Sequence, residues 1–283
     1  MTTAEQIAAY YAAIAEWDRG GRVGPMPSIP AEAFGALAAA TPDYLAPLGL
    51  DQLQAIRAMF VLYALLGLVG GFIYGRIPPR PPAAASGPVA ALGPSRGIVI
   101  RLARIFSIDS FGSGFVVQSL LALWLFERFD LSLTAAGLFF FWSGVLSAFS
   151  FPVAAWLARR IGLINTMVFT HIPANLCLIA AAFAPSLSIV LALLLIRAAL
   201  SQMDVPTRTS YVMAVVTEAE RPAAASFTVV PRSIASAITP SIGGALFAAG
   251  LQALPLVLAG VIKTAYDLLL LFQFRHVKPP EER

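Results

Sequence analysis

Long apolar segments constrain this chain most: about seven of them follow one another between residues 55 and 275, separated by short polar breaks. About 20 apolar residues in a helix cross the roughly 30 Å hydrocarbon core of a bilayer. The runs are too long for strands and do not alternate, and lipid offers no partner for an unpaired backbone group. We therefore predict an all-α membrane protein with about seven transmembrane helices.

The composition agrees with this prediction. Hydrophobic residues make up 58% of the chain and charged residues only 12%, against about 45–50% and about 25% in soluble domains. The single cysteine, Cys177, excludes an intrachain disulfide and a cysteine metal cluster, and two histidines are too few for a histidine-built metal site. We expect no cofactor and no metal. The net charge of +4 lies beside the apolar spans, which indicates membrane topology rather than nucleic-acid binding.

The predicted spans divide the chain into five parts. The spans are Ala58–Gly75, Ile100–Phe126, Ser132–Ala158, Ile161–Ala184, Leu187–Val216, Ala223–Gly250 and Leu254–Phe274. The five parts are an extracytoplasmic, partly amphipathic or disordered segment (1–54), a first transmembrane helix (55–76), a cytoplasmic Pro/Ala-rich linker (77–98), a six-helix bundle (99–275) and a cytoplasmic tail (276–283).

The basic residues predict the orientation. Arginines and lysines gather in alternate loops, including the linker and the tail. Basic loops stay in the cytoplasm, so the C-terminus is expected there and the N-terminal segment outside. Residues 1–17 have no signal-peptide pattern that would carry that segment across. Either the first helix acts as a reverse anchor or the chain lacks its natural beginning, and we favour the second explanation.

Short motifs at matching places carry a family resemblance. Val216–Arg221 is similar to a V-P-x-E-x-R turn, Thr239–Gly244 to a G-P-x-x-G-G helix element, and Ala158–Gly162 to a D-R-x-G loop. In these residues the chain resembles the major facilitator superfamily, with Ala158 standing where that loop has an acid. The gating salt bridge assigned to that acid is therefore in doubt here. Ser201–Arg208 looks like the corresponding helix of bacterial, drug-efflux-related members.

The resemblance implies a transporter rather than an enzyme. Members have two six-helix halves, and this chain matches the last helix of the first half and the whole second half. It implies a secondary active transporter of a small solute, or a fragment or half of one, working by alternating access in the bacterial cytoplasmic (inner) membrane. The expected partners are the lipid bilayer, an unknown small solute, and an N-terminal half or a second copy.

Charged residues inside the spans are the main functional signal. Each costs about 2.5–3.5 kcal/mol at a helix centre on insertion scales, so such side chains should face protein or water. Asp109, Asp204 and Arg232 lie at similar depth, and Arg197 has no acid within one turn of its own helix. Arg197 is thus a candidate for binding an anionic substrate group or an acid of a partner half. The candidates for a transport path or gate are Asp109, Gln118, Arg197, Asp204, Arg208 and Arg232.

Some of these residues have competing interpretations. Asp204 and Arg208 are spaced i,i+4, as are Lys263 and Asp267, and the latter two are expected to form a structural ion pair. We hypothesise that Asp109 or Asp204 titrates and couples proton movement to transport. His171, inside a span, is either a proton relay or a packing histidine.

Small residues and missing motifs complete the prediction. Gly67, Gly71 and Gly75 form a stripe that allows close helix packing, which we expect to be internal rather than a dimer face. No nucleophile-elbow, zinc-protease or phosphate-loop motif is found in the sequence, which disfavours an intramembrane enzyme or an ATP-driven pump. A structural or regulatory membrane subunit remains the main alternative.

Overall fold

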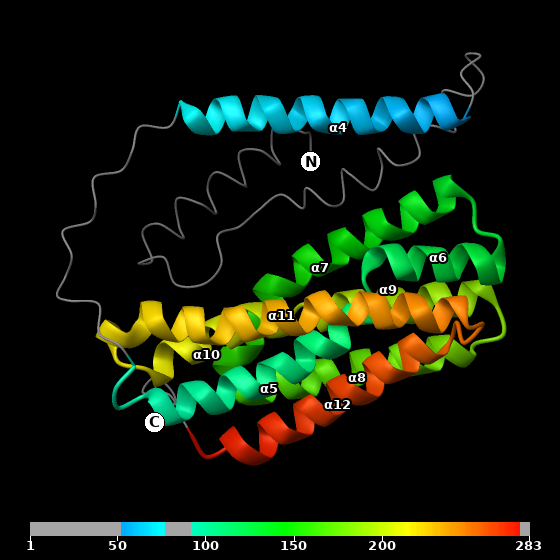
Figure 1. The fold of residues 1–283 in the computed structure, drawn as a ribbon. Helices are drawn as coiled ribbons and strands as arrows, with labels where there is room; N and C mark the ends of the chain where they lie inside the picture. The colour runs from blue at the N-terminus through cyan, green and yellow to red at the C-terminus, as the bar shows by residue number, and fades with distance from the viewer. Residues whose placement is uncertain (1–51, 77–91, 278–283) are drawn as a thin grey trace.

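A computed structural model describes residues 52–76 and 92–277, and every regular element within these ranges is helical (Figure 1). The all-α prediction is therefore confirmed. The predictions for residues 1–51, for most of the linker and for the last residues of the tail lie outside the described ranges. The first helix of the bundle begins at Arg96, directly after its N-cap residue Ser95 and slightly before the expected residue 99.

The helices follow the predicted spans closely. They are α4 (Gln52–Gly75), α5 (Arg96–Gly114), α6 (Gln118–Phe129), α7 (Leu133–Ile161), α8 (Leu163–Phe183), α9 (Leu187–Ser201), α10 (Asp204–Val215), the short 3-10 helix η2 (Glu218–Glu220), α11 (Arg221–Ala248) and α12 (Leu254–Phe274). In the described residues, six spans are long and apolar enough to cross a membrane: α4, α5 with α6, α7, α8, α9 with α10, and α12. The remaining predicted span, α11, is more polar, but its 28 residues extend for about 42 Å along the bundle.

Two predicted spans are each divided into two helices. Between α9 and α10, Pro206 has no amide hydrogen for the Gln202 carbonyl, and its ring would crowd that carbonyl. The chain turns there, and the amide of Val205 donates to Gln202 instead at 3.3 Å. Between α5 and α6 the helix ends at Gly114, and Val117 is extended (φ −59°, ψ 149°). Both breaks put polar side chains at mid-membrane depth.

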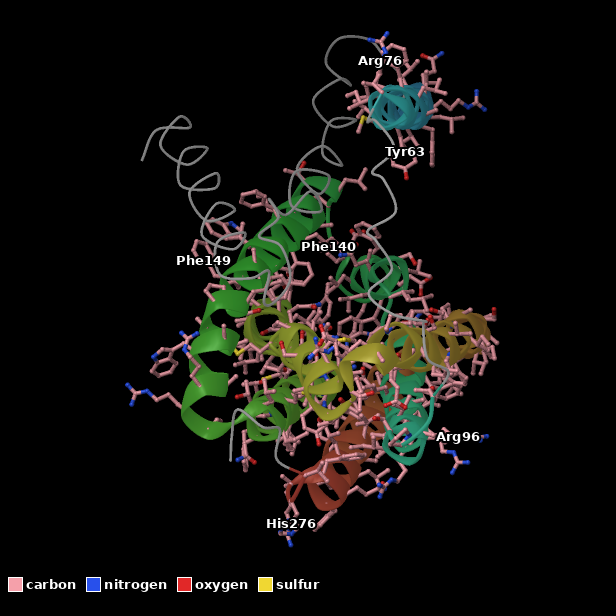
Figure 2. The ribbon with its side chains drawn as sticks, turned by 90° about the vertical axis from the view of Figure 1, so that its left-hand side faces the viewer. Tyr63, Arg76, Arg96, Phe140, Phe149 and His276 are labelled. Atoms are coloured by element: carbon pink, nitrogen blue, oxygen red, sulfur yellow. The ribbon has the colours of Figure 1, made fainter. Side chains whose placement is uncertain are left out.

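Helix α4 lies apart from the other helices (Figures 1 and 2). Its most apolar stretch has no buried residue, and Tyr63 is 79% exposed. A Cβ atom placed on Gly67, Gly71 or Gly75 would meet no atom within 4 Å. No other described helix reaches this glycine stripe, so its internal packing is not seen among the described residues and stays a prediction.

A polar layer separates two apolar cores in the bundle. One core contains Trp124, Leu178 and Leu256, and the other contains Phe106, Met167 and Leu270. Along α8 and α12, buried polar side chains such as His171 and Lys263 lie between these two groups. A charge in that layer has apolar packing on either side, so it must find its partners within the layer.

The start of α5 and the ends of α10 and α12 lie at one end of the bundle (Figure 1). This end faces the viewer in Figure 2, where Arg96 and His276 are labelled. Glu220 accepts hydrogen bonds from the Ser95 hydroxyl (2.6 Å), the Thr217 hydroxyl (2.6 Å) and the Gly93 amide (2.6 Å). These bonds, the Ser95 hydroxyl foremost, lower the pKa of Glu220 to about 2. An ionised Glu220 thus joins the start of α5 to the start of α11.

Candidate functional site

Asp109 on α5 is the centre of the polar layer. One carboxylate oxygen accepts from Lys263 Nζ on α12 at 2.5 Å, and the other accepts from Arg208 Nη2 on α10 at 2.9 Å. The carboxyl group is buried, and both cationic side chains are 6% exposed. One carboxylate therefore holds three helices together, and the second of its two cations, Arg208, also pairs with another acid.

That further acid is Asp204, which pairs with Arg208 one turn along α10 as the i,i+4 spacing predicts. The Arg208 guanidinium also lies 5.1 Å from the ring centre of Phe106 and 5.8 Å from that of Tyr266. A cation near aromatic rings is stabilised by their negative faces. Arg208 thus connects Asp109 and Asp204, the two acids that the sequence placed at one depth.

The expected pair between Lys263 and Asp267 is wrong, because each of them bonds to a different helix. Lys263 Nζ binds Asp109 and also donates to Ser113 Oγ at 2.7 Å. Asp267 shares a hydrogen bond with His171 Nδ1 and accepts one from Asn175 Nδ2, both at 2.9 Å and both on α8. Helix α12 crosses between α5 and α8, so its two charges serve different neighbours.

Two glycines allow these close contacts. A Cβ atom on Gly112 would lie 2.9 Å from Lys263 Cγ, and one on Gly114 would lie 2.7 Å from Thr239 Cβ on α11. Real Cβ atoms do not approach so closely without a shift of the neighbour. Glycine at these positions therefore lets α12 and α11 approach α5 and brings Lys263 within reach of Asp109.

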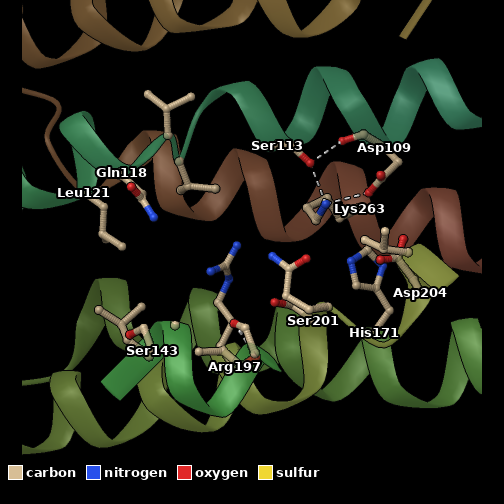
Figure 3. Close-up of a pocket in the computed structure, with 18 of the residues that line it drawn as sticks. Asp109, Ser113, Gln118, Leu121, Ser143, His171, Arg197, Ser201, Asp204 and Lys263 are labelled. Carbon is tan, nitrogen blue, oxygen red and sulfur yellow. Dashed lines mark hydrogen bonds and ion pairs between the residues drawn. The ribbon is translucent and has the colours of Figure 1, made fainter. Parts of the chain in front are cut away.

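The polar layer opens into a cavity of about 360 Å³ (Figure 3). All six residues predicted for a transport path line it: Asp109, Gln118, Arg197, Asp204, Arg208 and Arg232. Lys263 and His171 line it as well, whereas Asp267 lies behind His171 with no exposed surface. Helices far apart in the sequence thus contribute to one polar site.

Arg197 and Arg232 stand outside the central ion network. Arg232 was expected beside the two acids, but its Nε donates to Ser110 Oγ at 3.1 Å instead. Arg197 has no hydrogen-bond or ion-pair partner among the described residues, and its buried Nε is unsatisfied. Figure 3 shows its guanidinium pointing into the space toward which Gln118 also points.

Sequence reasoning did not assign site roles to the serines. Ser113 accepts from Lys263 and donates to the Asp109 carbonyl at 3.0 Å, and Ser110 accepts from Arg232. The available signal was spacing, because Ser113 follows Asp109 by one helical turn and so shares its face. A serine inside a span commonly bonds its own helix, so this spacing alone did not single it out.

A sequence model of the Major Facilitator Superfamily matches residues 105–283, which is more than half of the chain. No curated protein and no solved structure matches the chain. The matched region contains the whole polar layer and every residue that lines the cavity.

Proposed function

Because this chain belongs to the major facilitator superfamily, whose members are membrane transporters, we propose that its helices form part of a secondary active transporter whose translocation path passes through the cavity. The observation that carries the proposal is the convergence of charged side chains from α5, α9, α10, α11 and α12 on one space inside the bundle. Charges inside membrane spans are costly and therefore rare, and where they occur they commonly mark the path of a solute or ion.

The ion network gives this transporter a way to couple to protons. In the part of the chain that the structure describes, Asp109 pairs with two cations, whereas Asp204 pairs only with Arg208, which it shares with Asp109. A proton taken up by Asp204 leaves Arg208 to Asp109 alone and changes the contact between α10 and α5. His171 and Asp267 form a second buried pair that faces the network from α8 and α12. We infer alternating access driven by such partner exchange.

The coupling step is tested in proteoliposomes that hold the protein and an imposed pH gradient. Gradient-driven movement of radiolabelled lactate, glucose and tetraethylammonium is measured for the wild type, Asp109→Asn and Asp204→Asn. Asp130→Asn, at an exposed position after α6, is the matched control. We expect the wild type and the control to move at least one probe and both buried variants to lose coupling. Unchanged coupling in both buried variants would refute the mechanism.

The finer placement of the protein is also a proposal. Exposed basic residues such as Arg96, Arg160 and Arg275 lie near the starts and ends of helices that meet at one end of the bundle. Basic termini stay inside, which supports a cytoplasmic C-terminus. The resemblance of Ser201–Arg208 supports a drug-efflux-like member of a bacterial inner membrane.

We propose that an N-terminal half or a second copy completes the path. In family members the solute lies between two halves, and the cavity described here lies in one. Co-purification of differently tagged chains tests for a second copy. Association with an unrelated protein together with no gradient-driven flux would favour a structural or regulatory subunit instead.

A further inference from the structure

We propose that the cavity binds a small organic anion with an apolar body, and that the anionic group, a carboxylate, binds Arg197. This inference rests on the proposed function, because it names the class of solute that the site accepts. The argument uses the charge of the cavity wall, its unsatisfied donors and its apolar surface.

The cavity wall is cationic. Four cationic side chains line it, namely Arg197, Arg208, Arg232 and Lys263, against two acidic ones, Asp109 and Asp204. Arg208 and Lys263 are neutralised by those acids through direct ion pairs. Arg197 and Arg232 therefore leave a net charge of two positive, and counting Asp267 behind the wall as an anion still leaves one. A buried site with excess positive charge favours an anion.

The unsatisfied atoms of the wall include hydrogen-bond donors. Arg197, Arg208 and Ser143 line the cavity, and the buried Nε atoms of the two arginines and the buried Ser143 hydroxyl have no hydrogen-bond partner among the described residues. A buried donor without an acceptor costs about 1–3 kcal/mol. A guanidinium has only donors, so both arginine atoms require acceptor oxygens. A carboxylate supplies two such oxygens in a geometry that matches the guanidinium fork.

The position of Arg197 separates it from the coupling network. Figure 3 shows its guanidinium across the cavity from Gln118, while Asp109 and Lys263 lie further along α5 and α12. The amide of Gln118 offers a donor to the same carboxylate. An anion at Arg197 would thus occupy the cavity without displacing Lys263 from Asp109.

Apolar side chains also line the cavity. Leu121 on α6, Phe139 and Phe140 on α7, and Leu194 on α9 contribute to its wall. Pockets for organic ligands use apolar side chains together with placed polar groups, and this cavity has both. An inorganic anion would leave this apolar surface without contacts, so we infer an organic anion.

The test compares three probes of nearly the same shape and different charge: benzoate, benzamide and benzamidine. Their dissociation constants are measured by calorimetric titration of the full chain in lipid nanodiscs, without a gradient. We expect benzoate to bind at least about 10-fold more tightly than benzamide, the difference that one charge-assisted hydrogen bond supplies. Benzamidine should bind most weakly. Equal affinities, no benzoate binding or a preference for benzamidine would overturn the inference.

Variants assign the effect to Arg197. Arg197→Gln should weaken benzoate binding about 10-fold and remove the preference over benzamide, while Arg197→Lys should keep the preference. Arg159→Gln, at an exposed position outside the cavity, is the matched control. Arg197 has no partner to lose among the described residues, so Arg197→Gln should melt no lower than the wild type. Undiminished benzoate binding by Arg197→Gln would overturn the assignment.

The two proposals fail separately. Selective benzoate binding without gradient-driven flux of any probe would count against the transport function and leave the anion site in place. Proton-coupled flux that depends on Asp109 or Asp204, together with no selectivity for benzoate, would overturn the anion site alone.

Discussion

Replacing Asp109 by asparagine removes the one carboxylate that holds α5, α10 and α12 together. Lys263 and Arg208 are each 6% exposed at the side chain, and Lys263 would lose its ion-pair partner while Arg208 would keep only Asp204. Breaking a buried ion pair by removing one partner costs about 3–5 kcal/mol, because an uncompensated charge stays in a medium of low polarity. We expect Asp109→Asn to lose about this much free energy of unfolding.

The loss can be measured by equilibrium unfolding with sodium dodecyl sulfate in mixed micelles, followed by far-ultraviolet circular dichroism. Asp130→Asn is the control, since Asp130 is exposed and has φ 51°, a conformation that asparagine also adopts readily. The double variant Asp109→Asn with Lys263→Met removes the stranded ammonium together with its acid. It should be more stable than Asp109→Asn by at least about 1 kcal/mol.

Two results would refute this reasoning. A loss below about 1 kcal/mol for Asp109→Asn would mean that water or other groups solvate the two cations, since buried pairs cost more than this to break. A double variant whose loss equals the sum of the two single losses would mean that Asp109 and Lys263 do not interact energetically.

Two further predictions concern packing and pH. Gly114→Ala should destabilise the bundle by about 1–3 kcal/mol, because the added Cβ would lie 2.7 Å from Thr239 Cβ. Gly71→Ala is the control, because its added Cβ meets no described atom within 4 Å and should not destabilise the bundle. Melting temperatures in detergent compare the two variants, and equal effects would contradict the packing. The low pKa of Glu220 means that its contribution to stability is complete above its ordinary pKa of 4.5 and is lost as the pH falls toward about 2. The melting temperature of the wild type should therefore fall more steeply across this window than that of Glu220→Gln, and parallel curves would show that the bonds from Ser95 contribute nothing.

The choice of partners inside the membrane was only partly predictable. The Asp204–Arg208 pair follows from spacing, because residues four apart share a helix face, but the second partner of Arg208, Asp109, does not. The same spacing gave the wrong partner for Lys263 and Asp267. In the fold, Lys263 bonds to Asp109 on α5 and Asp267 bonds to His171 on α8, rather than to each other along α12. The sequence does not show which helices α12 crosses.

The sequence by itself determined that the chain is a set of membrane helices and which residues are costly within them. Bilayer thickness and the need to pair every backbone group depend only on composition and length, so apolar runs and buried charges can be found without a fold. Only the tertiary structure decided that α4 stands apart from the other described helices, that Asp109 lies between two cations and that Arg197 has no partner within the described ranges. These facts depend on how the helices cross. The crossings depend on close contacts such as that of Gly112 with Lys263, where a shift of a few tenths of an ångström decides whether the side chains fit.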